Sequence, residues 1–431
     1  MVTVAVVTVT RFTDIARLRR LHPPIMFYGR RKTGKTFLVR QYYGGADYFF
    51  VKRDRSVYWE NRGRSLSYSE FTGVLDALRG GLVIVDEFHR LPEEFLDYLH
   101  VVQPGNVVLV TSTLHLAKRL LSSRSPLLGL FLGYRVDLID ERDILVNLAG
   151  LYRGRDLVER AVFLREPMLL RWADVGLAEL LGYMRLAVPA LVGEIFLEEE
   201  RMLGERYEGI LRAVASGRRT VGDVTGYLYG RRLIDRQDAS LVKSYMRVLL
   251  AIGLLKRYPE HGGRRYFYHV ASPLIDLYFY LDEKYNFSEA DLPASYVGEK
   301  LPLYVEDFVR ELLAKVYGLR VEIPRSPDVD FVLSRFSRPL VAGEVKWRRS
   351  VPESELSLVE ERLAATKARR RILVVPSVEA LPRRPRGVEV LDAEKLVSLA
   401  RESIGSLEKG GLWGGQRDEA GRPGYSEGYV D

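Results

Sequence analysis

The feature that most constrains the fold is the segment GRRKTGKT, Gly29 to Thr36, which fits the pattern G-x-x-x-x-G-K-[ST] at every fixed position. The apolar run PPIMFY precedes it, and KTFLVRQYY follows it. The pattern and its flanks predict a short buried strand, a glycine-rich loop and the first turn of a helix. The alternative, an ordinary surface turn, requires none of the four fixed residues.

Such a loop turns its backbone N–H groups inward around phosphate oxygens. Gly29 and Gly34 leave the space that a Cβ would fill, and the N-terminus of the following helix favours an anion. Lys35 is expected to reach the β- and γ-phosphates, and the Thr36 hydroxyl to ligate Mg²⁺. The residues predicted to surround the phosphates are Gly29, Arg30, Arg31, Lys32, Thr33, Gly34, Lys35, Thr36 and Phe37.

A second motif supplies the carboxylates that a phosphate-loop hydrolase needs. The apolar residues Leu82 to Val85 end in Asp86-Glu87, about fifty residues after the loop. Asp86 is predicted to hold Mg²⁺ at the end of a buried strand, and Glu87 to orient and deprotonate the attacking water. For an isolated Asp-Glu pair, the alternative is a strand-end charge or a helix cap.

A third apolar run, NVVLVTSTLHLAKRLL, ends in hydroxyl side chains. A hydroxyl at this position can contact the γ-phosphate and position the water, and both Thr111 and Ser112 are candidates. The alternative is ordinary capping of the following helix by Ser or Thr.

Together the segments FTDIARLRRL, MFYGRRKTGKTFLV, LVIVDEFHRLPEEFLDYL, VVLVTS and RSPLLG resemble the archaeal-type ATPases of the AAA+ class. The resemblance covers residues 11 to about 140. It implies an α/β P-loop ATPase core that uses ATP and Mg²⁺, distantly related to origin-recognition initiators and signalling NTPases. No Asn-Lys-x-Asp guanine signature follows the third strand, which also favours ATP over GTP.

The sequence departs from this family at two places. It has Thr111-Ser112-Thr113 where members usually have Gly-Ser-Ser, and Gly129-Leu130-Phe131 where they have Gly-Arg-Arg. An arginine at the second place could stabilise γ-phosphate charge in the transition state. Arg124 or Arg135 could substitute for it, and turnover is expected to be slow.

The rest of the chain is predicted to form further units. The predicted division is a P-loop ATPase core at 1–140, a helical lid at 141–204, a winged-helix domain at 205–285, a nuclease-like α/β domain at 300–400 and a flexible tail at 401–431. The opening MVTVAVVTVT is predicted to be a β-strand. The apolar periodicity of the lid is expected to break at Pro167 and Pro189.

The winged-helix prediction rests on three helical segments followed by a hairpin that turns on Gly262-Gly263. Four basic residues of this region are expected to meet phosphates beside a DNA groove. Two share a face of the third helix and two lie on the wing: Lys243, Arg247, Arg264 and Arg265. The alternative is a solvated basic face, or a domain used only for contacts within the protein.

The last folded segment carries an acidic pattern. PDVDFVLSR and PLVAGEVKWRR read as strands, and two-residue alternation places Glu344 and Lys346 on one face. With Asp330 this is the pattern of PD-(D/E)xK nucleases, in which two carboxylates hold Mg²⁺ and the lysine steadies the attacking water. Glu306 on the preceding helix could complete the metal shell. The alternative is a plain surface pair.

Composition bounds the remaining choices. The chain has 431 residues, no cysteine and a net charge of +8, which excludes disulfides and thiolate zinc sites and leans modestly toward polyanionic partners. No apolar run reaches 18 residues, so a cytoplasmic protein without membrane contact is expected. Association of several copies stays open. Three alternatives remain: an ATPase acting on DNA, a slow nucleotide switch of the signalling type, and a nuclease regulated by ATP.

Overall fold

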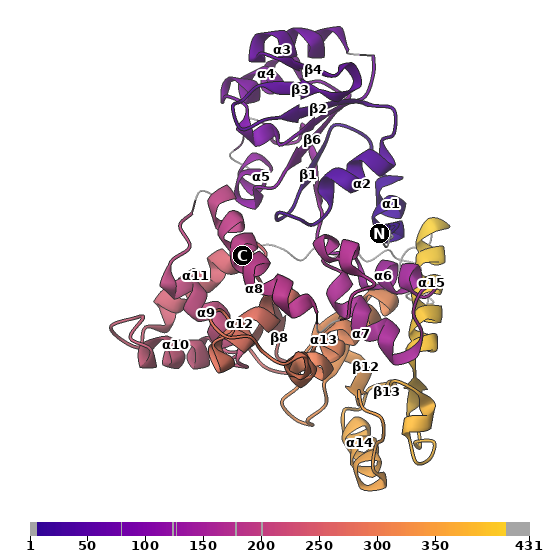
Figure 1. Ribbon diagram of the computed structural model, residues 1–431. Coiled ribbons are helices and arrows are strands. Elements are labelled where there is room, and N and C mark those ends of the chain that lie inside the picture. Colours follow the sequence, from indigo (N-terminus) through magenta and orange to yellow (C-terminus); the bar gives the residue numbers. More distant parts are fainter. Residues whose placement is uncertain are drawn as a thin grey trace.

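The computed structural model describes residues 7–78, 80–122, 125, 127–176, 179–199 and 201–410. It is a mixed α/β structure with a seven-stranded sheet in one part and a five-stranded sheet in another (Figure 1). The first sheet has the order β4-β3-β2-β5-β6-β1-β7. Its strands are β1 Ile25–Tyr28, β2 Asp47–Val51, β3 Val57–Trp59, β4 Arg64–Leu66, β5 Val83–Asp86, β6 Val107–Thr111 and β7 Leu132–Arg135.

The strands β2, β5, β6, β1 and β7 of this sheet run parallel, which brings their carboxyl ends to one edge. Tyr28 at the end of β1 lies opposite Thr111 of β6, and Asp86 at the end of β5 lies opposite Val110. Ligands of open α/β sheets bind outside this edge. The three motifs found in the sequence therefore meet there.

Helices cover both faces of the sheet because each face is apolar. They are α1 Phe12–Leu18, α2 Lys35–Tyr42, α3 Tyr68–Ala77, α4 Glu94–Val102 and α5 Leu114–Leu120. One face buries Phe49, Phe71 and Phe95, and the other buries Leu18 and Phe27. The predicted N-terminal strand is wrong for its described part, since residues 7–10 have no strand structure.

The region after the first sheet is helical, with α6 Glu141–Leu148, α7 Gly154–Leu164 and α8 Leu180–Glu198. Pro167 begins a short 3₁₀ turn, as expected of a residue without an N–H. The predicted break at Pro189 is wrong, because α8 continues through it. Buried neighbours such as Val188, Val192 and Phe196 supply packing that offsets the missing hydrogen bond.

The next segment has three helices and a hairpin, as its periodicity predicts. These are α9 Glu205–Ala215, α10 Val221–Gly230, α11 Ala239–Ala251, β8 Leu255–Pro259 and β9 Tyr266–Val270, followed by α12 Pro273–Tyr285. β8 and β9 pair antiparallel, and Gly262 in their turn has a φ of 68°, which suits glycine. The assignment of this segment as a winged-helix domain stays a prediction.

The C-terminal segment folds around the second sheet, of order β10-β11-β12-β13-β14. Its elements are α13 Val297–Tyr317, β10 Arg320–Glu322, β11 Phe331–Arg335, β12 Arg338–Val345, α14 Glu353–Ala365, β13 Arg370–Val374, β14 Glu389–Leu391 and α15 Ala393–Glu408. β11 and β12 pair antiparallel and form a hairpin. Only Phe336 and Ser337 lie between the two strands, and both have positive φ.

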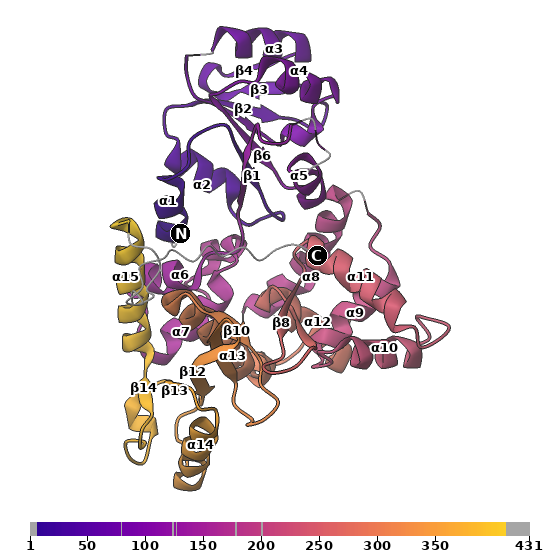
Figure 2. The same cartoon turned by 180° about the vertical axis from the view of Figure 1, so that it is seen from behind.

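The predicted boundaries do not separate independent cores. One apolar core runs continuously from the helical region through α9–α13 to one face of the second sheet and α15. Figures 1 and 2 both show α15 beside α6 and α1. Arg20 donates to the Leu407 carbonyl at 3.1 Å, and Arg142 to Ser403 at 3.1 Å.

The start of the predicted tail at 401 is therefore too early, because α15 runs to Glu408 and buries Ile404 and Leu407. Residues 411–431 lie outside the described part. Among the described residues, no helix is long and apolar enough to cross a membrane.

Candidate functional site

The loop between β1 and α2 has the backbone that its glycines predict. A Cβ on Gly29 would lie 2.1 Å from the Val136 carbonyl oxygen, so no other residue fits without moving the strand end. Gly34 has a φ of 85°, a region that L side chains rarely adopt. The loop thus has a shape that places α2 with its N-terminus toward the edge of the sheet.

Lys35 lies inside this loop, with an exposed fraction of only 6%. Its Nζ donates to the Gly29 carbonyl at 2.8 Å and to the Arg30 carbonyl at 2.9 Å. Burial lowers the pKa of Lys35 to about 8, against the raising effect of Glu87 and other carboxylates. The ammonium is therefore held by neutral partners that phosphate oxygens can replace.

Thr36 and Asp86 join the first two motifs. The Thr36 hydroxyl donates to Asp86 Oδ2 at 2.7 Å, and the Tyr48 hydroxyl donates to the same oxygen. Asp86 is almost fully buried, at 1% exposure. A hydroxyl and a carboxylate oxygen are ligands of the kind Mg²⁺ takes beside a nucleotide phosphate, so these residues fit the ion.

Glu87 follows directly in a left-handed backbone conformation with a φ of 59°. Such a conformation costs on the order of 1–3 kcal/mol in a non-glycine residue and marks a position fixed by its surroundings. The Glu87 carboxylate accepts from Ser112 Oγ at 3.2 Å and pairs with Arg90 at 3.2 Å. Burial, followed by the charge of Asp86, raises the pKa of Glu87, which makes its carboxylate a better base.

The two hydroxyl candidates on β6 have different surroundings. Ser112 faces Glu87, whereas the Thr111 hydroxyl lies 3.1 Å from His89 Nδ1 and accepts from the Thr113 N–H at 3.1 Å. Burial lowers the pKa of His89 to about 4, so this ring is neutral at pH 7. Ser112 is therefore the hydroxyl that shares a site with the predicted base.

The other loop residues divide between internal contacts and the surface. Arg30 is buried and pairs with Glu166 at 2.5 Å. Arg31 pairs with Glu194 at 2.7 Å and also with Glu198. The remaining loop side chains are placed as follows: Thr33 is buried with its hydroxyl 3.0 Å from the Arg30 carbonyl, while Lys32 and Phe37 are exposed.

The end of α8 reaches this site from the helical region. Glu199 accepts from the backbone N–H groups of Leu114 at 2.5 Å and His115 at 2.8 Å, which fastens α8 to the start of α5. Glu198 raises the pKa of Glu87 and opposes the lowered pKa of Lys35. A carboxylate thus lies near the groups predicted to receive the γ-phosphate.

Several residues of this site have no predicted role from the sequence. They are Tyr48 and His89 beside the β5 and β6 strand ends, Arg90, Glu166, Glu194 and Glu198. His89 and Arg90 follow Asp86-Glu87 within the DEFHRL segment, and this closeness in sequence is a signal that could have marked them. No local signal marks Glu198, because its partner Arg31 is 167 residues away.

Two arginines could substitute for the arginine that is missing at Leu130-Phe131, and the structure describes only one of them. Arg124 lies outside the described residues. Arg135 ends β7 opposite Tyr28, close to the same edge of the sheet. Its guanidinium is exposed and pairs with Asp137 at 2.8 Å.

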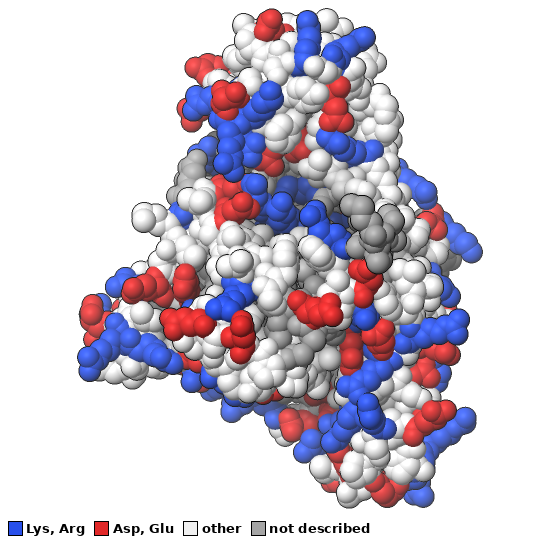
Figure 3. Space-filling model, viewed as in Figure 1, with Lys and Arg blue, Asp and Glu red and all other residues white. Residues whose placement is uncertain are grey.

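Figure 3 shows Lys and Arg side chains gathered in the hollow between the first-sheet part and the helical half. Figure 1 places the start of α2 at the same level. Lys32 is exposed and Arg31 half-buried. Arg31 is paired with Glu194 and Glu198, so part of this positive charge is neutralised within the protein.

The structure also brings the predicted nuclease-like residues together. Asp330 Oδ2 accepts from the Val345 N–H at 2.6 Å, and the Asp330 backbone nitrogen lies 3.3 Å from Glu344 Oε2. Lys346 pairs with Glu344 at 2.6 Å. Burial, then the charges of Glu306 and Glu344, raises the pKa of Asp330 to about 8.

Each carboxylate of this cluster already has a nitrogen partner within the protein. In the described ranges, no group of three or more His, Cys, Asp or Glu side chains is placed to hold a metal ion. Glu306 contacts Arg310 at 3.2 Å, and the same guanidinium nitrogen reaches the Asp330 carbonyl at 3.3 Å. Metal binding here stays a prediction.

The four predicted DNA-contacting residues are all exposed, with two on α11 and two in the β8–β9 turn: Lys243, Arg247, Arg264 and Arg265. The hairpin itself is fixed to the C-terminal sheet. His261 Nδ1 lies 2.6 Å from Glu322 Oε2, and Ile323 donates its N–H to the Pro259 carbonyl at 2.9 Å.

Three solved structures, two of ATPases and one of an ORC2 protein, are similar to this chain. A Walker-type ATPase of Pyrococcus abyssi is 15% identical, over 62% of this chain and 94% of that one, with a TM-score of 0.42. The ORC2 protein of Aeropyrum pernix, in ADPNP and ADP complexes, is 15% identical over 70% and 94%, with a TM-score of 0.35. A signal transduction ATPase with numerous domains from Pyrococcus horikoshii is 15% identical over 71% and 45%, with a TM-score of 0.24.

No family model matches the sequence, and no curated protein matches it. With 15% identity and TM-scores of 0.42 or less, these similarities do not assign a function to this chain.

Proposed function

We propose that the protein is a Mg²⁺-dependent ATPase of the phosphate-loop class with an AAA+-like core. The observation that carries this proposal is the contact of 2.7 Å between the Thr36 hydroxyl and Asp86 Oδ2. It joins two motifs about fifty residues apart at the edge where parallel strands end. Thr36 and Asp86 would hold Mg²⁺, which would neutralise charge on the β- and γ-phosphates of ATP.

The chemical step falls to Glu87 and Ser112. Glu87 is fixed by its left-handed backbone and by contacts with Ser112 and Arg90. Its raised pKa suits a group that orients a water and accepts its proton. Lys35, released from its carbonyl partners, would offset the charge of the γ-phosphate.

A slow nucleotide switch is the second candidate, and the contacts of α8 favour it. Glu194 and Glu198 hold Arg31 of the loop, so binding of ATP must compete with two carboxylates. Glu166 connects Arg30 to the Ser272 hydroxyl, which caps α12. Nucleotide binding would therefore change contacts that lead into the rest of the molecule.

DNA is proposed as the macromolecular partner, through the exposed basic residues of α11 and the β8–β9 turn. Replacing all four with Ala should weaken DNA binding and lower the slope of log K against log salt by close to one for each phosphate that is no longer neutralised. Unchanged affinity and slope would limit this region to contacts within the protein. Cleavage of DNA by the cluster that contains Glu344 stays a further proposal. Mg²⁺-dependent nicking of plasmid DNA tests it.

The test of the proposed function is steady-state hydrolysis of ATP and GTP by the full chain, with Mg²⁺ or with a chelator. We expect ATP turnover that needs Mg²⁺ and changes when DNA is added. Asp86→Asn should remove most of the Mg²⁺-dependent ATP turnover, because a ligand of the ion is lost. Asp97→Asn, on the exposed side of α4, should leave that turnover unchanged. Nucleotide binding without turnover would favour the switch. Absence of both would overturn the proposal.

A further inference from the structure

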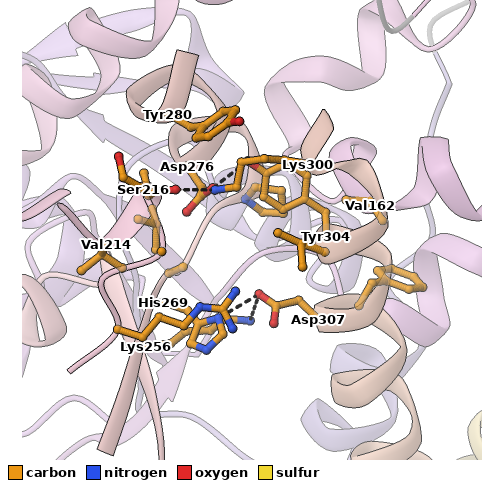
Figure 4. Close-up of a pocket in the computed structure, with 18 of the residues that line it drawn as sticks. Val162, Val214, Ser216, Lys256, His269, Asp276, Tyr280, Lys300, Tyr304 and Asp307 are labelled. Carbon is orange, nitrogen blue, oxygen red and sulfur yellow. Dashed lines mark hydrogen bonds and ion pairs between the residues drawn. The ribbon is translucent and has the colours of Figure 1, made fainter. Parts of the chain in front are cut away.

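A cavity of about 180 Å³ lies where the helical region, the three-helix segment and α13 meet (Figure 4). Its walls come from α7, the end of α9, β8, β9, α12 and α13. Charged side chains from several of these elements line it, among them Lys256, Asp276, Lys300 and Asp307. Because a charge shielded from water is costly unless it is paired, the partners of these side chains decide what the cavity can bind.

The acidic side chains on one wall are satisfied within the protein. Asp276 pairs with Lys300 and accepts from the Tyr304 hydroxyl at 2.6 Å. At the edge of the cavity, Glu299 pairs with Lys284 at 2.8 Å. Both carboxylates therefore already have a cationic partner within the protein.

A second wall is likewise occupied. Asp307 pairs with Arg310 and lies 3.2 Å from His269 Nδ1. Lys256 lies 3.5 Å from Glu311. His269 is 5% exposed, and burial together with nearby cations holds its pKa well below the usual value, so the ring carries no charge at pH 7.

Arg219 is different. Arg165, which also lines the cavity, pairs with Glu141 at 2.7 Å, but the Arg219 guanidinium has no ion pair or hydrogen bond with any described residue. Burial lowers the pKa of Arg219, as expected where water is partly excluded, while the charges of Glu306 and Asp276 act in the opposite direction without an ion pair to the guanidinium. Within the described part of the chain, no side chain neutralises this cation directly.

We propose that this cavity binds a small oxyanion, with the Arg219 guanidinium as its ligand. A guanidinium presents a planar fork of donors that matches a phosphate or carboxylate group. An engineered cavity of about 150 Å³ admits benzene, so this one has room for such a group and several further atoms. The site lies outside the proposed nucleotide-binding loop.

Titration calorimetry with inorganic phosphate and with acetate tests the site. The protein should carry Lys35→Ala, so that the phosphate loop does not dominate the binding. We expect one of the two anions to bind in the millimolar range or tighter, and the added change Arg219→Ala to weaken it about tenfold or more. The matched control is Arg218→Ala, whose guanidinium stacks on Tyr227 instead, 4.6 Å from the ring centroid.

Two results would overturn the proposal: binding of neither anion, or binding unchanged by Arg219→Ala. Thermal unfolding gives a separate check. Without an anion, Arg219→Ala should be at least as stable as its parent, because a partly desolvated cation without a direct partner is removed. A clear loss of stability would show that Arg219 serves the fold, not a ligand.

Discussion

The phosphate loop and the Asp330 cluster both place a carboxylate at a strand end near a lysine, yet the lysines are held differently. Lys35 donates to two backbone carbonyls. Lys346 instead pairs with Glu344 at 2.6 Å and with Glu355 at 3.4 Å. One lysine has neutral partners, and the other has two anionic ones.

This difference decides how easily a ligand can replace the present partners of each lysine. A phosphate can replace carbonyl partners of Lys35 at little cost, because a charged acceptor binds an ammonium more strongly than a neutral one. At the cluster, a metal would have to displace Lys346 from Glu344 and the Val345 N–H from Asp330. We therefore infer that the phosphate loop carries the activity and that the C-terminal sheet serves first as structure or binding surface.

The largest effect is expected from Lys35→Ala, which removes the buried cation of the loop. ATP affinity should fall at least about 100-fold, the scale of two missing charge-assisted hydrogen bonds. The exposed neighbour Lys32 provides the matched control, and Lys32→Ala should change affinity only slightly. Near-normal ATP binding by Lys35→Ala, measured by calorimetry, would remove the distinction between the two sites.

The pKa of Lys35 gives a second test. Only the protonated amine attracts phosphate, so ATP affinity should fall as pH rises through about 8, by up to about tenfold per pH unit. Bound phosphates raise the pKa of Lys35, so binding at about pH 8 to 9 should take up protons. Calorimetry in two buffers of different ionisation enthalpy measures this uptake. Absence of proton uptake would mean that Lys35 is fully charged before ATP arrives.

A smaller change is expected at the end of α8. Glu198→Gln removes a carboxylate that competes with the nucleotide for Arg31, so ATP affinity should rise about three- to tenfold. The side chain of Glu194 is 42% exposed against 12% for Glu198, and Glu194→Gln should therefore have less effect. A decrease of affinity in Glu198→Gln would show instead that α8 helps to hold ATP.

An effect of similar size, on stability and not on ATP affinity, is expected at Asp330. Because its pKa is raised to about 8 in the folded protein, the folded state keeps a proton that the unfolded chain releases. The free energy of unfolding should thus fall as pH rises from about 4 to about 8. Asp330→Asn should remove this fall. At about pH 9 the variant should be more stable than the wild-type protein by roughly 1–2 kcal/mol. If Mg²⁺ stabilises the wild-type protein at that pH but not Asp330→Asn, the cluster holds metal after all.

Local patterns were predictable where one short segment carries the whole requirement. The loop needs only Gly29 to Thr36, and the β11–β12 hairpin needs only alternation and a turn. The contacts of Glu198 were not predictable, because they join residues far apart in the sequence. The length of α15 was missed for the same reason, since Ile404 and Leu407 are buried by distant helices.

Proline shows a different limit. Its missing N–H predicts an interruption, and Pro167 indeed starts a new turn. Pro189 lies inside α8 because the burial of the apolar residues around it outweighs one missing hydrogen bond. Local propensity gives way to packing at such positions.

The most direct test of the central claim is the hydrolysis rate of Glu87→Gln. The amide keeps the size of the side chain and its contact with Ser112 but cannot accept a proton. Mg²⁺ and ATP should bind with near wild-type affinity, while turnover falls at least about 100-fold, the usual scale for losing a general base. The control Glu94→Gln, on the exposed face of α4, should turn over ATP normally. An unchanged rate in Glu87→Gln would contradict the role of Glu87 as the group that activates water.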